Sequence, residues 1–215
     1  LRRTLGTGGD DFPQLLEELR GYFQPARAGQ TVRAVPGEGL NVPIWLLSSS
    51  GFSAQLAGLL GLPFAFAGQF SPQAMVASCD LYRRVFRPSG ALLEPYAMMG
   101  VNVIAADTDA AARRLATSHQ QAFLNMIRGR PGKLPPPLET MDGHWSSAEE
   151  AAVAGNLGAS IVGGPDTVRR GLQALLAETR ADEIIIHAMI FDPVARMRSY
   201  EIVAEAWDAA DEGGA

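Results

Sequence analysis

The sequence predicts an α/β protein built around a parallel sheet. Short apolar runs of strand length alternate along the chain with longer amphipathic stretches, and small or polar residues separate them. This alternation is typical of right-handed βαβ units, whose strands run parallel. Four strands stand out, at residues 42–47, 63–68, 96–105 and 182–192. They suit either a small open sheet or part of a closed (β/α)₈ barrel, which needs eight strands and about 250 residues, so periodicity leaves both open.

Composition fits this fold class and excludes several others. The chain has 215 residues, 47% of them hydrophobic and 19% charged, and can bury a sizeable core. A net charge of −5 without a basic stripe argues against a nucleic-acid partner. The single cysteine, Cys79, rules out an internal disulfide framework and fits a cytoplasmic location. No apolar run approaches the ~20 residues of a membrane span, so no membrane association is expected.

The chain opens with a helix and a loop before its organising stretch. Acidic residues precede an apolar stripe from Phe12 to Phe23 at helical spacing, which predicts the helix. Repeated Gly and Pro predict a loop at residues 24–39. The apolar run at 42–47 then has the composition of a strand buried on both faces, and an Ala/Leu-rich helix follows from about Ser53.

Between that strand and that helix lies Ser48-Ser49-Ser50-Gly51, which together with Ser53 we call the serine turn. N–H groups at a helix start have no intrahelical partner, serine hydroxyls stand beside them, and Gly51 permits close approach of a ligand. The serine turn is therefore an anion site whose commonest occupant is phosphate. The alternative is that the serines only cap the helix, and local chemistry favours neither interpretation.

The middle of the chain repeats the strand–helix pattern. After the run at 63–68, Ser71 and Pro72 have the residue types of a helix start. The strand at 96–105 turns into a long helix that ends near Ile127. The buried stripe expected on the first of these helices comprises Met75, Cys79, Tyr82 and Phe86.

A Pro/Gly-rich insertion at residues 129–145 precedes the last units and is too long for an ordinary βα connection. Ser146 then begins a helix, and Pro165 begins another after Gly163-Gly164. That glycine pair lacks the spacing of a phosphate-binding motif and is more simply a turn before a helix. The last helix carries apolar residues at Met197, Tyr200, Val203 and Trp207.

Four stretches resemble the C-terminal half of the luciferase-like monooxygenases, the flavin-dependent family that includes bacterial luciferase. They read PIWLLSSSGFSAQLAGLLGLPFAF, VNVIAADTDAAARRLATS, SIVGGPDTVRRGL and the closing strand and helix, in that order. The chain departs from the family pattern at Ser48, where glycine is usual, and at Ala111 or Ala112, where an acid is common. The resemblance implies the C-terminal half of a TIM-type (β/α)₈ barrel, as one domain over residues 1–210 with a disordered tail at 211–215.

The resemblance also implies a function. The family uses reduced FMN, or in some branches a deazaflavin, with oxygen on a small organic substrate. The family's turn after the fifth barrel strand contacts the cofactor phosphate, and the serine turn corresponds to it, in agreement with the anion site. The insertion at 129–145 corresponds to a mobile loop that acts as a lid and shields the reduced flavin from water.

With the first four βα units absent, the resemblance implies open sheet edges and an uncovered apolar interior. We therefore expect a homo-oligomer, and a flavin reductase is a further candidate partner. The alternative is a truncated, non-catalytic half barrel that retains at most weak flavin binding. An unrelated phosphate-binding α/β enzyme is disfavoured by the four ordered motifs.

His187 and His144 are the catalytic candidates, and each has a plainer alternative. His187, within the last strand, is either a proton donor at the barrel mouth or, more commonly for such a position, a hydrogen-bonded wall residue. His144, in the insertion, would meet substrate under a closed loop or be solvated, and His119 is expected at the surface. Histidines so dispersed predict no metal site.

Two further polar residues lie within or just after strands. Asn102 is the odd polar residue in an apolar strand, and either points into the barrel mouth or bonds a neighbouring backbone. Asp192 ends the last strand, a position that is functional in many barrels, or caps the next helix. Cys79 lies among helical apolar positions and is interpreted as a buried structural thiol.

Overall fold

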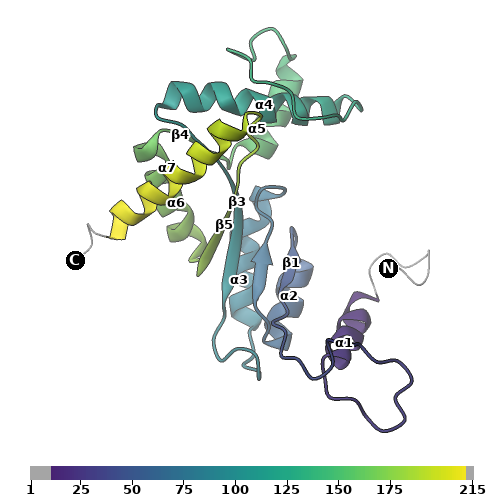
Figure 1. The fold of residues 1–215 in the computed structure, drawn as a ribbon. Helices are drawn as coiled ribbons and strands as arrows, with labels where there is room; N and C mark the ends of the chain where they lie inside the picture. Colours follow the sequence, from purple (N-terminus) through teal and green to yellow (C-terminus); the bar gives the residue numbers. More distant parts are fainter. Residues whose placement is uncertain (1–10, 212–215) are drawn as a thin grey trace. The chain divides into compact units, whose positions relative to one another are not determined.

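The computed structural model describes residues 11–211, and their side chains through residue 208 (Figure 1). The chain divides into two compact units that meet between Ile44 and Trp45. The first contains the helix α1 (Phe12–Tyr22) and the predicted loop. Of the expected apolar stripe only Leu16 is buried, while Leu15 and Phe23 are partly buried and Phe12 and Leu19 are exposed. The single domain over residues 1–210 stays a prediction, and the expected tail lies outside the described residues except for Asp211, which ends the last helix.

The second unit is built on a parallel sheet, which confirms the predicted fold class. Its strands are β1 (Leu46–Ser48), β2 (Phe64–Phe66), β3 (Ala97–Ala105), β4 (Ile161–Gly163) and β5 (Glu183–His187). The long strand β3 lies at the centre and pairs in parallel with β2, β4 and β5. Its first residues pair with β2 and β5, and its last three pair with β4, while β1 pairs with β2 at an edge.

The strands differ from the prediction in number and length. β1 begins at Leu46 rather than residue 42, and Leu47 is 66% exposed, so this run is not buried on both faces. Leu46, which points to the opposite face of the sheet, is 3% exposed, whereas no described segment covers the face on which Leu47 lies. β4 was not predicted, because its apolar run is only Ile161-Val162 and glycines follow it directly. β5 ends at His187, five residues before the predicted boundary at 192.

Helices follow the strands and pack beside them (Figure 1). They are α2 (Gly51–Leu60), the 3₁₀ turn η1 (Pro72–Ala74), α3 (Met75–Val85), α4 (Asp109–Ile127), α5 (Ser147–Leu157), α6 (Pro165–Thr179) and α7 (Pro193–Asp211). The predicted stripe on α3 is confirmed for Met75, Cys79 and Tyr82, whereas Phe86 is partly exposed. On α7 only Val203 of the four apolar residues is buried, because Ile202 and Ala206 complete the face that packs on the sheet.

The two faces of β3 have different surroundings. Val101, Val103 and Ala105 point to the helix side and pack with Leu172 and Ile202. In a βα barrel the helices form the outer ring, so we call the opposite face of the sheet the inner face. Alternation along β3 places Met98, Gly100, Asn102 and Ile104 on this inner face. There Leu47 and Ile185 remain 66% and 57% exposed, which agrees with the expected uncovered apolar interior.

Candidate functional site

The serine turn lies at the carboxyl end of β1, the end of a parallel strand at which barrel active sites lie. Ser50 is the N-cap residue of α2, but its side chain makes no capping hydrogen bond. The Ser48 hydroxyl instead donates to the Ser50 carbonyl at 2.8 Å and accepts from the Ser50 N–H at 3.3 Å. The serine hydroxyls therefore do not cap α2, and Ser48 serves to shape the turn.

The remaining serines differ in what they can offer a ligand. Ser49 and Ser50 are exposed, and no side chain or backbone of the described residues bonds to their hydroxyls. Ser53 is only 9% exposed and lies on the buried side of α2. A Cβ at Gly51 would lie 3.3 Å from the Leu81 side chain, so glycine allows α2 to begin close to α3. The donors available to an anion are thus Ser49, Ser50 and the first N–H groups of α2; phosphate binding here stays a prediction.

Other helix starts in the unit use a group from their own chain. The Gly164 N–H, where α6 begins, donates to Asp109 Oδ1 at 2.6 Å. This bond is the main reason that the pKa of Asp109 lies below its ordinary value. Asp192 Oδ1 accepts from the Ala195 N–H at 2.8 Å and caps α7. Gly163-Gly164 is therefore an ordinary turn, Asp192 is a cap, and the serine turn differs from both in lacking an internal carboxylate.

Two candidates that lie far apart in the sequence meet on the inner face. Asn102 and His187 are paired in the register of β3 and β5, and His187 Nδ1 lies 2.9 Å from Asn102 Oδ1. Asn102 is 4% exposed, whereas His187 is exposed. His187 is thus hydrogen-bonded to the neighbouring strand, and its catalytic role stays a prediction; Asn102 bonds a side chain rather than a backbone. Neither residue's sequence context indicated its partner.

His119 is partly buried, and the expectation of a surface position is wrong. It follows Leu115 and Ala116 by one turn of α4, so it shares the helix face that packs on Ile104 of the inner face. Burial is the main cause that lowers the pKa of His119 to about 4, and the charge of nearby His187 lowers it further. His119 is therefore neutral at pH 7.

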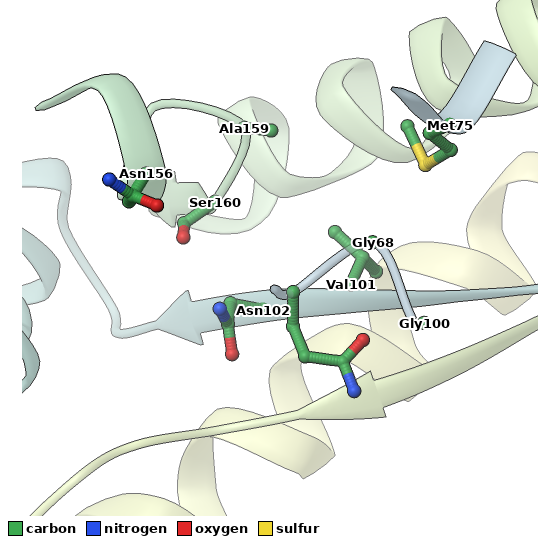
Figure 2. Close-up of a pocket in the computed structure, with 9 residues that line it drawn as sticks. Gly68, Met75, Gly100, Val101, Asn102, Asn156, Ala159 and Ser160 are labelled. Carbon is green, nitrogen blue, oxygen red and sulfur yellow. The ribbon is translucent and has the colours of Figure 1, made fainter. Parts of the chain in front are cut away.

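Gln69, just after β2, is a polar residue that sequence reasoning missed. Its Oε1 is buried and has no hydrogen-bond partner among the described residues. It lines a pocket of about 10 Å³, room for about one water molecule. Figure 2 shows Asn102 on one side of this pocket and Asn156 and Ser160 on the other. A Cβ at Gly100 would collide with Gln69 Oε1, so glycine at this position leaves space for the Gln69 side chain.

The insertion at residues 129–145 lies along α4 and is held there. Thr117 Oγ1 accepts from the Leu138 N–H at 2.8 Å, and Arg114 pairs with Glu139 at 2.5 Å. Arg128 donates to the carbonyl of His144 at 3.0 Å, while the His144 side chain is exposed. Any lid motion would have to break these contacts, so lid function and a role for His144 stay predictions.

Cys79 is fully buried, as interpreted from the sequence. Burial raises the pKa of its thiol to about 11, so the group is protonated and unreactive at neutral pH.

Within residues 11–211 no three His, Cys, Asp or Glu side chains gather where they could hold a metal ion. None of the described helices has the length and hydropathy of a membrane span.

Comparison with known proteins identifies the family. The model of the family described as luciferase-like monooxygenase matches residues 14–183. The uncharacterised protein YvbT of Bacillus subtilis is 54% identical over 96% of this chain, and a luciferase-like monooxygenase of Escherichia coli is 47% identical over 95%. The chain spans only 62% and 61% of these two relatives.

Solved structures agree on the fold. Apo-MsnO8 superposes with a TM-score of 0.84 at 32% identity, over 96% of this chain and 63% of its own. Two more distant structures share the fold alone: a coenzyme F420-dependent tetrahydromethanopterin reductase from Methanopyrus kandleri (TM-score 0.56, 14% identity) and the oxygenating constituent of 3,6-diketocamphane monooxygenase from Pseudomonas putida in complex with FMN (0.50, 20%). They cover 89% and 78% of this chain, and it covers 60% and 48% of theirs. With a parallel sheet of TIM-barrel type and a family match over most of its length, the chain belongs to the luciferase-like monooxygenase family.

Proposed function

We propose that the protein is a flavin-dependent monooxygenase that uses reduced FMN, or a deazaflavin, with oxygen on a small organic substrate. Family membership supports the class, and structures of the same fold bind FMN or depend on F420. The observation that carries the proposal is the serine turn, with unpaired donors at the carboxyl end of β1. When bound, the flavin would supply the electrons and activate oxygen, while the protein binds, orients and excludes water.

The serine turn suits a phosphate on three physical grounds. The first N–H groups of α2 point out of the helix, and the helix dipole adds partial positive charge at this end. The hydroxyls of Ser49 and Ser50 stand exposed beside them. No carboxylate of the described chain fills the turn, in contrast to Asp109 at the start of α6. An anionic ligand would therefore gain donors here without displacing an internal partner.

The inner face beside this anchor exposes Leu47 on β1, whereas Gly100 on β3 is buried under the Gln69 side chain. β3 lies two strand positions from β1, or about 10 Å at the usual strand spacing. A ring that extends from the serine turn toward Asn102 would therefore have to displace the side chain of Gln69.

Added charge at the serine turn tests the proposal. The double variant Ser49→Glu/Ser50→Glu places two carboxylates where the phosphate would lie, and like-charge repulsion should weaken FMN binding about a hundredfold or more. Binding is measured by fluorescence titration. The matched control Ser147→Glu/Ala148→Glu adds the same charge at exposed positions on α5 and should leave the affinity unchanged.

Riboflavin, which lacks the phosphate, sharpens the test. Its affinity should be low for the unmodified chain and insensitive to the glutamates. An unchanged FMN affinity in the Ser49/Ser50 variant would contradict the phosphate assignment. Oxygen consumption driven by a flavin reductase then separates a monooxygenase from a chain that binds flavin without turnover. Sizing chromatography on the same sample tests the expected homo-oligomer.

A further inference from the structure

The hydrogen bond between Asn102 and His187 fixes the state of the imidazole. An amide oxygen only accepts, so Oδ1 at 2.9 Å requires a proton on Nδ1 of His187. In the neutral ring the other nitrogen, Nε2, then carries a lone pair and is an acceptor. No hydrogen bond within the described residues reaches Nε2, and the ring is exposed. The pair therefore presents an unused acceptor on the inner face.

The nearest inner-face neighbours of this acceptor along β3 and β5 are apolar. Ile185, two residues earlier on the same face of β5, is 57% exposed beside it. Ile104, two residues after Asn102 on β3, is buried under Leu115 and Ala116 of α4. His119 follows on that helix face and is neutral above about pH 4. One oriented polar atom among apolar walls is the usual composition of a small-molecule pocket.

The pair lies away from the proposed phosphate anchor. In the sheet, β5 is three strand positions from β1, or about 14 Å at the usual spacing. A ligand held at the serine turn would reach Gly100 before it reached His187. The acceptor is thus placed for a second molecule on the same face rather than for the phosphate end of the cofactor.

We propose that Asn102 and His187 form a substrate subsite in which Nε2 of His187 accepts a hydrogen bond from an O–H or N–H group of an otherwise apolar molecule. Asn102 is the positioning residue, because it selects the tautomer without adding charge. This inference rests on the proposed function, because it assigns the part of the same proposed active site that would bind the substrate. It specifies a substrate class: small and apolar, with a hydrogen-bond donor.

The tautomer is tested first, on the unmodified chain. Long-range ¹H–¹⁵N NMR of the histidine rings separates protonated from bare nitrogens, and His119→Gln and His144→Gln assign the three histidines of the chain. We expect Nδ1–H and a bare Nε2 for His187. A proton on Nε2 would overturn the proposal. Asn102→Leu should abolish the preference of His187 for the Nδ1–H tautomer. Asn102→Asp keeps an acceptor oxygen at this position and should retain that preference.

The ligand class is tested with two probes of similar shape. Phenol carries an O–H donor and anisole does not. Phenol should shift the His187 Nε2 resonance in a saturable way and bind about tenfold more weakly to Asn102→Leu and to His187→Phe, whereas anisole should leave Nε2 unmoved. Equal responses to phenol and anisole, or no response to phenol, would sink the subsite.

These outcomes are separable from those of the proposed function. The phenol experiment contains no flavin and does not involve the serine turn. Loss of FMN binding with an intact phenol response would reject the flavin proposal and keep the subsite as a binding site. The reverse result would reject the subsite alone.

Discussion

The two faces of β3 show how one strand divides stability from binding. On the helix side, Val101 and Val103 are buried against α6 and α7. On the inner face the same strand carries Gly100 and Asn102, beside exposed Ile185. The helix side is a closed apolar core, whereas the inner face is exposed at Leu47 and Ile185 and holds polar groups with unused hydrogen-bonding capacity. Substitutions on the two faces should therefore affect different measurements.

The largest expected effect is on the free energy of unfolding, when a leucine is replaced by alanine on the helix side and, for comparison, on the inner face. Leu172→Ala removes a 2% exposed side chain from the helix-side core and should lower the free energy of unfolding by about 2–5 kcal/mol. Leu47→Ala makes the same change at a 66% exposed position on β1 and should cost no more than about 0.5 kcal/mol. Urea unfolding followed by circular dichroism measures both.

Comparable losses in the two variants would contradict this division. They would mean that Leu47 is covered in solution, for example by a second copy of the chain. Sizing chromatography of Leu47→Ala distinguishes that case, because a covered residue would also change the oligomeric state.

A smaller loss of stability is expected at the close contact between Gly68, in the turn after β2, and Gly100 of β3. A Cβ at Gly68 would lie 2.5 Å from the Gly100 carbonyl oxygen, so Gly68→Ala must push backbone apart and should destabilise by about 1–3 kcal/mol. Gly90→Ala meets no atom within 4 Å and should be neutral or slightly stabilising. A neutral Gly68→Ala would show that the contact between the turn after β2 and β3 is loose.

The helix side of this sheet could be predicted from sequence and the details of the inner face could not. Apolar periodicity located β2, β3, α3 and α4, because buried residues repeat with the period of each element. It failed for β4, whose apolar run is only two residues long, and for the start of β1, whose apolar run includes exposed Val42. It also failed on α1, where only Leu16 of the expected stripe is buried.

The candidate site shows the same division. The serine turn is contiguous in sequence, so its residue types could indicate an anion site. The bond between Asn102 and His187 joins residues 85 positions apart and depends on the register of β3 with β5, which no local pattern encodes. Gln69 was missed for a related reason, because its orphaned oxygen exists only where the chain folds over Gly100.

The smallest expected effect concerns His119, which sequence reasoning placed at the surface. Its pKa is about 4 in the folded chain against 6.5 for an unperturbed histidine, so the unfolded state binds a proton more readily. Stability from this residue is complete above about pH 6.5 and is lost as the pH falls toward 4. Between pH 7.5 and 5 the free energy of unfolding should fall by about 1–2 kcal/mol, since one pKa unit corresponds to 1.36 kcal/mol and the ring is only partly buried.

The variant His119→Gln should flatten this part of the pH dependence, and His144→Gln, at an exposed position, should leave it unchanged. The ion pair of Glu149 with Arg128 affects this slope only near pH 5, because the pKa of Glu149 is about 2 in the folded chain and 4.5 for an unperturbed glutamate, and it affects both variants alike. An unaltered slope in His119→Gln would place His119 in solvent. The wall that α4 provides beside His187 would then be missing, and the inner face would be more open than the packing of Ala116 on Ile104 indicates.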